Sequence, residues 1–337
     1  MNSRERVKRT IEFRNPDRAP RDLWQVPLLR MRQGNAVVDA FESRWPKDIC
    51  QATGRKNKPV MVRGDASALG EYRDEWGCVY VNKTAGIMGE VKDPVLADWD
   101  FDRMHVPNEL LDVDLDKVNA FAGNSDKYVL ASGWARPFER IQFLRGTENV
   151  YMDLALDSPE IRKLIDIVHG FYLKDMQTWV KTPVDALVIM DDWGMQKSLL
   201  IRPAIWRRVF KPLYKEYCDL AHSHGKHVWM HSDGYILDIL PDLIEVGVNV
   251  INSQLFCMPI EEIGMRFKGK IAFWGEIDRQ HILPSGSVRE VEQAVERVHQ
   301  NLWQNGGCIA QFDWTPETPP ANAEAVYATW DRLTGST

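Results

Sequence analysis

The segment that decides the fold is His227-Val228-Trp229-Met230-His231-Ser232-Asp233-Gly234. It has the pattern of an apolar strand that ends in a histidine and, two residues later, in a carboxylate. Residues two apart on a strand point to the same face of the sheet, so we expect His231 and Asp233 to project together. Such a pair at the carboxyl end of a strand is typical of sites in α/β enzymes.

Other apolar runs end in polar residues in the same way. They are Ala186–Met190 before Asp191-Asp192-Trp193, Ile271–Gly275 before Glu276, and Cys308–Phe312 before Asp313. Because parallel strands bring their carboxyl ends to one edge of a sheet, these polar side chains are predicted to gather at one site.

From about residue 128 strand-like runs alternate with helical stretches. The runs begin near Tyr128, Ala186, His227, Val248, Ile271 and Cys308, and the helical stretches cover residues 159–180, 203–222, 236–246 and 288–304. Continuously apolar strands separated by helices predict a parallel sheet with helices on its outside. Two earlier strand candidates, one of them at residues 22–27, bring the count to about eight, which favours a (β/α)8 barrel of the TIM type.

A doubly wound nucleotide-binding sheet is less favoured, because no glycine-rich phosphate motif follows any strand. Short runs separated by turn residues over residues 59–91 predict a small antiparallel insertion in the N-terminal third. No repeat, linker or low-complexity tract interrupts the chain, so we expect one domain over residues 1–337.

The composition bounds the possible partners. With 337 residues, 44% of them hydrophobic, the chain can bury a large core, and a net charge of -6 gives no footprint for nucleic acid. No run approaches the roughly 18 apolar residues that span a bilayer. The N-terminus has no apolar signal core, which predicts a cytoplasmic location. Five cysteines without a CxxC pair predict neither disulfides nor a zinc knuckle, and the arginines of residues 6–21 are expected on a solvated face.

Each candidate site residue also has a structural interpretation. His231 and Asp233 fit a metal site or an acid–base pair; the alternative, made less favoured by Glu276 and Asp313 at neighbouring strand ends, is a core histidine hydrogen-bonded to Asp233, which would also cap the following helix. Of Asp191 and Asp192, at most one can face the barrel mouth, and the other is expected to cap a loop or to pair with Arg202 or Lys197. Glu276 could be catalytic or could pair with Arg279.

Asp313 lies between Phe312 and Trp314, an apolar setting that perturbs a carboxylate unless a cation or donors satisfy it. Trp134, Trp193 and Trp274 also follow strand ends. Their flat apolar faces predict walls for an organic substrate.

The chain resembles the uroporphyrinogen decarboxylase superfamily along nearly its whole length. The motifs that carry the resemblance are Arg4-Glu5-Arg6-Val7, Asn15–Pro20, Asp74–Gly77, Asp191–Gly194, His231–Gly234, Phe273–Asp278 and Thr315–Asn322. The resemblance implies a (β/α)8 barrel with its site in the mouth. It is strongest to a branch that resembles corrinoid methyltransferases, whereas Arg30–Gly34 only superficially resembles the arginine-rich segment of the decarboxylases.

Methyltransferases of this superfamily hold zinc with a His-x-Cys pair and a further cysteine in the last strand. By resemblance these positions correspond to His231, Asp233 and Asp313, so both thiolates are replaced by carboxylates. A His/Asp/Asp set favours water-activating zinc, a harder metal such as manganese or iron, or no metal. Thiol activation is therefore not expected, but methyl transfer between a corrinoid and a carrier such as tetrahydrofolate does not need the thiolates.

Three hypotheses follow, in order of preference. The first is a methyl-transferring enzyme, with His231, Asp233 and Glu276 in the chemistry and small-molecule binding by Asp191 or Asp192 and the tryptophans. A corrinoid-binding protein is then an expected partner. The second is a metal-dependent lyase or hydrolase, including a decarboxylase, that uses the same mouth. The third is a binding module that delivers a corrinoid or tetrapyrrole without turnover.

Overall fold

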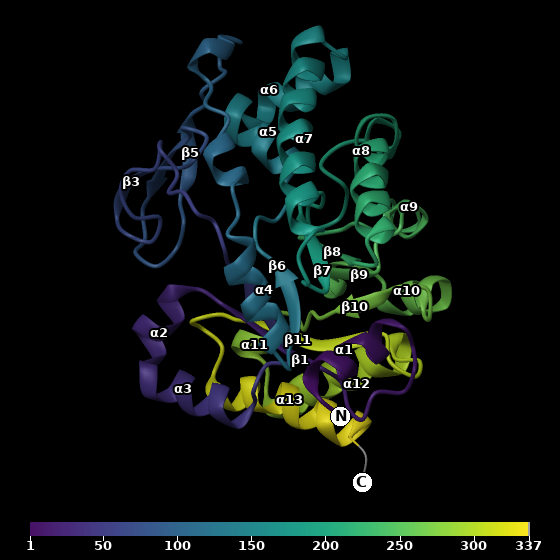
Figure 1. Cartoon of the computed structure of the whole chain (residues 1–337). Coiled ribbons are helices and arrows are strands. Elements are labelled where there is room, and N and C mark those ends of the chain that lie inside the picture. The colour runs from purple at the N-terminus through teal and green to yellow at the C-terminus, as the bar shows by residue number, and fades with distance from the viewer. Residues whose placement is uncertain (336–337) are drawn as a thin grey trace.

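The computed structural model describes residues 1–335, and eight parallel strands within them form a nearly closed barrel with helices outside (Figure 1). The barrel strands are β1 (Arg21–Gln25), β2 (Ile49–Ala52), β6 (Tyr128–Ala131), β7 (Ala186–Met190), β8 (His227–Ser232), β9 (Val250–Ser253), β10 (Ala272–Trp274) and β11 (Cys308–Trp314). Their order is β1-β11-β10-β9-β8-β7-β6-β2. The predicted (β/α)8 barrel is confirmed.

The helices lie mainly between successive strands, as the alternation in the sequence predicted. They are α1 (Ser3–Ile11), α2 (Pro27–Gln33), α3 (Asn35–Arg44), α4 (Leu115–Asn124), α5 (Pro137–Arg145), α6 (Thr147–Leu156), α7 (Pro159–Trp179), α8 (Pro203–Ser223), α9 (Leu240–Val246), α10 (Ile260–Phe267), α11 (Ile282–Ser285), α12 (Val288–Leu302) and α13 (Pro320–Thr334), with 3-10 turns η1 (Phe101–Arg103), η2 (Asn108–Leu111) and η3 (Leu255–Cys257). A Ser287–Glu290 capping box begins α12. Within residues 1–335, no helix is both long enough and apolar enough to cross a membrane.

The two ends of the sheet, β1 and β2, are joined through Asp48. The backbone N–H of Asp48 donates to the carbonyl of Arg21 at 2.8 Å, and the Arg21 N–H donates to Asp48 Oδ2 at 2.7 Å. Arg6 and Arg18 hydrogen-bond the same carboxylate at 2.6 and 2.8 Å. The expectation of a solvated arginine face is therefore wrong here, because the charge of buried Asp48 draws Arg6 and Arg18 inward; Arg6 is only 8% exposed.

The insertion after β2 carries an antiparallel sheet of β3 (Gly70–Arg73), β4 (Val79–Asn82) and β5 (Glu90–Asp93). The strands lie within or just beyond the range predicted, and the run at residues 59–63 forms only an isolated bridge between Arg63 and Arg73. Figure 1 shows this sheet on the side of the molecule opposite the two termini. Arg140 of α5 ties it to the barrel through ion pairs with Asp74 and Glu75.

Large side chains fill the barrel interior. Trp229 of β8 and Trp274 of β10 meet edge to face with ring centroids 4.8 Å apart, and both are fully buried. The alternation along β8 then places His231 one pleat nearer the carboxyl end, on the same inward face as Trp229. The packed tryptophans therefore lie directly below the polar side chains at the carboxyl ends of the strands.

Candidate active site

His231 is held from behind by an amide. Its Nδ1 lies 2.6 Å from Oδ1 of Asn252, which is on the neighbouring strand β9. The amide nitrogen of Asn252 donates to the Trp274 carbonyl and, at 3.0 Å, to Gln311 Oε1, so its oxygen must accept. Nδ1 of His231 therefore carries a proton, and Nε2 is the atom presented to the mouth.

Two carboxylates face that nitrogen. Asp192 Oδ1 lies 3.4 Å and Asp233 Oδ1 lies 3.7 Å from His231 Nε2. Burial by itself would lower the pKa of His231, but Asp192 and Asp233 raise it to about 9. Burial would likewise raise the pKa of Asp192, but the hydrogen bond and charge of His231 hold it below its usual range. The predicted proximity of His231 and Asp233 is thus found, with Asp192 as a third member.

Asp191 points the other way, as the alternation along the chain required. Its carboxylate accepts the backbone N–H groups of Phe138 and Glu139 at 3.1 and 3.0 Å and the hydroxyl of Tyr214 at 2.5 Å. It thereby caps the first turn of α5, and burial raises its pKa well above the ordinary value. The structure places Asp191 among these donors and Asp192 at the mouth.

Arg279 gathers the other predicted acids. It lies 2.5 Å from Asp233 Oδ2, 3.1 Å from Asp313 Oδ2 and 3.5 Å from Glu276 Oε1. Burial raises the pKa of Glu276 to about 8 against the attraction of Arg279, and burial also raises the pKa of Asp313. The sequence offered two interpretations of Glu276, an ion pair with Arg279 and a catalytic role. The ion pair is present, and it is compatible with a catalytic role in the same cluster.

Sequence reasoning named Arg279 only as a partner for Glu276. Its position three residues after Glu276 in Gly275-Glu276-Ile277-Asp278-Arg279 was the one available signal, but nothing in the sequence indicated that Asp233 and Asp313 converge on the same guanidinium. Asn252 was likewise missed, since it follows only the short run Val250-Ile251.

A divalent metal ion fits the residues around His231 Nε2. Ligand atoms of Asp192, His231 and Asp233 all lie within 4.8 Å of one another. Asp233 Oδ1 is buried and has no hydrogen-bond partner among residues 1–335, which leaves it free to bind a cation. The group does not include Asp313, the third ligand expected from the resemblance, and Asp192 completes it instead. One imidazole and two carboxylates suit zinc or a harder metal.

Tryptophans wall the mouth beside this cluster. A cavity of about 410 Å³ is lined by Trp24, Trp134 and Trp274 together with Asp22 and Asp313. Trp24, on β1, covers His231 with ring centroids 4.9 Å apart. Trp134 and Trp274 both line this cavity, although Trp274 is only 1% exposed, and their role in substrate binding stays a prediction. Trp24 and Asp22 were missed although both lie in the predicted first strand.

Trp193 is located elsewhere. It is fully buried and stacks on Phe138 with ring centroids 4.0 Å apart, and its indole N–H donates to Tyr214 at 2.9 Å. It packs between the β7 loop, α5 and α8 and lines neither this cavity nor the next. Neighbouring residues on an extended segment face opposite sides, which sends Trp193 into the helix layer with Asp191.

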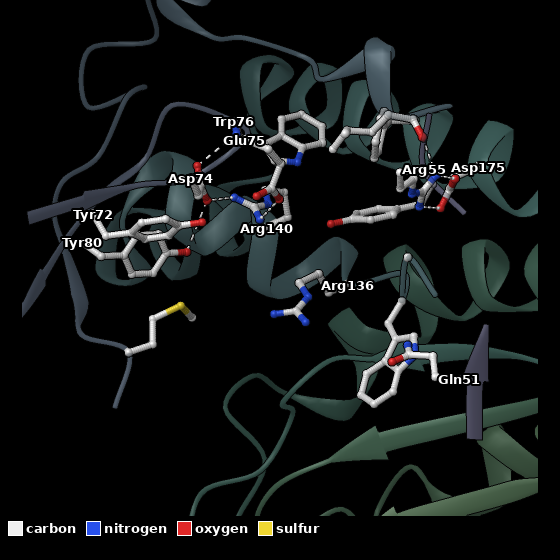
Figure 2. Close-up of a pocket in the computed structure, with 16 residues that line it drawn as sticks. Gln51, Arg55, Tyr72, Asp74, Glu75, Trp76, Tyr80, Arg136, Arg140 and Asp175 are labelled. Atoms are coloured by element: carbon white, nitrogen blue, oxygen red, sulfur yellow. Dashed lines mark hydrogen bonds and ion pairs between the residues drawn. The ribbon is translucent and has the colours of Figure 1, made fainter. Parts of the chain in front are cut away.

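A second cavity of about 490 Å³ adjoins the mouth on the side of the insertion. Gln51 and Trp134 line both cavities, so the two spaces meet at these residues. Figure 2 shows the side chains of the second cavity, with Arg136 near its open centre and Arg55 paired with Asp175. We call this space the chamber.

The match to a family model and the likeness to one solved structure agree with this architecture. The family model described as uroporphyrinogen decarboxylase matches residues 76–333. The solved structure of a methyltransferase from Methanosarcina mazei is 15% identical, with a TM-score of 0.69, and the match covers 99% of each chain. A xylanase from Gloeophyllum trabeum is 13% identical with a TM-score of 0.40, over 64% of this chain and 79% of the xylanase. No curated protein sequence matches the chain.

Proposed function

Since this chain belongs to the uroporphyrinogen decarboxylase family, we propose that it is an enzyme that transfers a methyl group at its barrel mouth. The methyl group would pass between a corrinoid, or a methylated small molecule, and an acceptor. The similar Methanosarcina mazei protein is a methyltransferase, which supports this reaction class. The observation that carries the proposal is the cluster of Glu276, Arg279, Asp233 and His231, which can supply a proton beside an apolar cavity.

Each residue of the cluster has a role in this proposal. When a methyl group leaves an oxygen or nitrogen, that atom gains an electron pair and needs a proton. Glu276, with its pKa of about 8, is protonated at neutral pH and is the proposed donor. Arg279 would stabilise the resulting carboxylate through the 3.5 Å contact. Trp24 and Trp134, whose rings are partly exposed, would exclude water and stack on a planar ring.

The implied cofactors have defined places in this proposal. A corrinoid, which a partner protein could carry, or tetrahydrofolate would accept or donate the methyl group, and a divalent ion would polarise the heteroatom that bears it. Asp192, His231 and Asp233 would hold that ion, with Asn252 orienting the imidazole. Asp313 would keep Arg279 in position.

A second candidate is supported by the same donor set. No cysteine lies in the group formed by Asp192, His231 and Asp233, and such hard ligands are also typical of metals that activate water. A metal-dependent lyase or hydrolase, including a decarboxylase, would use Glu276 as its proton donor. The two candidates differ in their products, so one assay separates them.

The test uses purified protein, reduced cobalamin and a panel of methyl ethers and methylamines, with mass spectrometry of every product. We expect demethylation by the wild-type protein and a loss of about 100- to 10,000-fold in Glu276→Gln, which keeps the shape but cannot donate the proton. The control is Glu261→Gln, an exposed residue of α10 that pairs with Arg297. Decarboxylated or hydrolysed products without methyl loss would favour the second candidate.

A further inference from the structure

The chamber has an aromatic wall contributed by two parts of the chain. Tyr72 and Tyr80 of the insertion lie with ring centroids 5.9 Å apart. Trp76, from the turn between them, meets Phe171 of α7 at 5.1 Å, edge to face. All four residues line the same space, and Tyr72 is the one whose side chain is not buried, so its ring offers a surface suited to a flat ring rather than to a flexible aliphatic chain.

The acids of the chamber are already engaged. Asp175 forms a bidentate pair with Arg55, in which Nη2 and Oδ2 are 2.7 Å apart. Asp74 and Glu75 both pair with Arg140, the latter at 2.9 Å. Their oxygens are therefore poor sites for a cationic ligand, because a guanidinium already occupies each of them.

Arg136 is the cation of the chamber with donors to spare. Within residues 1–335, the only hydrogen bond that its guanidinium makes is to the thioether of Met190, at 3.3 Å, and a thioether is a weak acceptor. Its ion pair with Glu139 is loose, at 3.4 Å. Figure 2 shows the guanidinium directed into the open part of the chamber, away from the two tight ion pairs.

Arg136 also lies close to the mouth cavity and to His231. Met190, its hydrogen-bond partner, lines the mouth cavity and is paired in register with His231 across β7 and β8. A ligand anion on Arg136 would thus lie between the aromatic wall and the proposed reacting centre. Trp134, which lines both spaces, would flank the passage.

We propose that the chamber binds an aromatic carboxylate beside the methyl-transfer centre, with the carboxylate on Arg136 and the ring against Tyr72. This inference goes beyond the proposed function, because the carboxylate, and not the ring, faces the methyl-transfer centre. Arg136 acts here as a ligand-binding residue, since a guanidinium matches a carboxylate with two parallel hydrogen bonds.

Binding can be measured by calorimetry with three probes that separate the two contributions. The probes are 4-methoxybenzoate, the uncharged 4-methoxybenzamide and the non-aromatic cyclohexanecarboxylate. We expect 4-methoxybenzoate to bind about 10-fold or more tightly than either of the others, because only it satisfies both Arg136 and the aromatic wall. Equal affinities for all three, or no binding of 4-methoxybenzoate, would overturn the inference.

Variants locate the site. Arg136→Gln should lower the affinity for 4-methoxybenzoate to that for the amide, and Tyr72→Leu, on the insertion side, should weaken both aromatic probes. The control Arg162→Gln removes an exposed arginine of α7 that pairs with Asp157 and should change nothing. Unchanged binding in both Arg136→Gln and Tyr72→Leu, with thermal unfolding as in the wild type, would place any ligand elsewhere.

Binding and turnover assays distinguish a failure of the aromatic-acid site from a failure of the proposed function. His231→Ala should abolish methyl transfer yet still bind 4-methoxybenzoate. If the wild-type protein binds that probe through Arg136 but transfers no methyl group, the proposed function fails and the aromatic-acid site stands. If it transfers methyl groups but does not bind that probe through Arg136, the aromatic-acid site fails and the proposed function stands.

Discussion

At the scale of single residues, the orientation of His231 depends on Asn252. The strand pattern predicted that His231 and Asp233 share a face, and they do, because the two-residue period of a strand is a local property. Asn252 and Arg279 could not be predicted as their partners, nor Gln311 as the partner of Asn252, since these contacts depend on how strands distant in sequence are registered. Asp313 was placed at the mouth by its strand end, but its cationic partner comes from another segment.

The proposed ligand set can be tested by exchanging the two acids. Asp192→Ala should weaken binding of zinc or manganese by more than about 10-fold, because even an outer-shell partner is worth about 10- to 100-fold. Asp313→Ala should keep the metal, since Asp313 faces Arg279. Metal content of the purified variants by mass spectrometry measures both effects. Loss of metal in Asp313→Ala with retention in Asp192→Ala would restore the set expected from the family resemblance.

Asp22 links pH to stability at the mouth. Burial raises its pKa from 3.8 to about 6, although Trp274 donates a hydrogen bond to it. Between these two pH values the folded state binds more protons than the unfolded state, so the stabilisation by a protonated Asp22 is lost as the pH rises. Asp22→Asn should therefore raise the free energy of unfolding by about 1–3 kcal/mol at pH 7.5.

The same substitution should have little effect at pH 4, where Asp22 is largely protonated in the folded protein. Urea denaturation at both pH values provides the comparison. An equal gain at pH 4 and pH 7.5 would mean that the carboxylate charge is not what costs stability.

At the scale of elements, most strands and helices were predictable, and the exceptions have physical reasons. The later strands are continuous apolar runs, which β2 (Ile49-Cys50-Gln51-Ala52) is not, and no strand was predicted there. Its burial comes from β6 on one side and from the barrel core, not from its own composition. The insertion was predicted by its turns, but β3 and β5 are short and largely exposed, so their limits were set by pairing with β4 and not by hydrophobicity.

Arg140 of α5 is the tether between that insertion and the barrel. It is 4% exposed and pairs with Asp74, which is 3% exposed. Breaking a buried pair from one side leaves an uncompensated charge, so Arg140→Met should cost about 3–5 kcal/mol of unfolding free energy. Arg162→Met, in an exposed pair, should cost under about 0.5 kcal/mol. Chemical denaturation of the two variants measures the difference, and equal costs would contradict a tethering role.

At the scale of the whole molecule, the barrel depends on Asp48 to bring the ends of the sheet together. Burial alone would raise the pKa of Asp48, but the hydrogen bonds and charge of Arg18, with Ser3 and the Arg21 N–H, hold it below its usual range. A lowered pKa stabilises the fold above the ordinary carboxyl value, and that contribution is lost as the pH falls through the folded pKa. The (β/α)8 class could be predicted from the alternation, but this closure joins segments whose pairing no local pattern specifies.

Asp48→Asn should accordingly lower the unfolding free energy by about 2–4 kcal/mol at pH 7, with a smaller difference at pH 3. The matched control is Asp39→Asn, an exposed partner of Arg30 that should behave as the wild type. Denaturant titration at the two pH values measures the unfolding free energies of both variants. A penalty in Asp48→Asn that is independent of pH would assign its effect to packing.

The chamber and the acid cluster occupy separate stretches of the chain. Every residue that lines the chamber falls between Gln51 and Asp175, whereas Asp192, His231, Asp233, Glu276, Arg279 and Asp313 all follow it. Recombination between relatives at a crossover near residue 180 would therefore exchange all the chamber residues together. The acid cluster that handles the proton would be kept unchanged. The ligand specificity of such proteins can thus change while their catalytic residues stay the same.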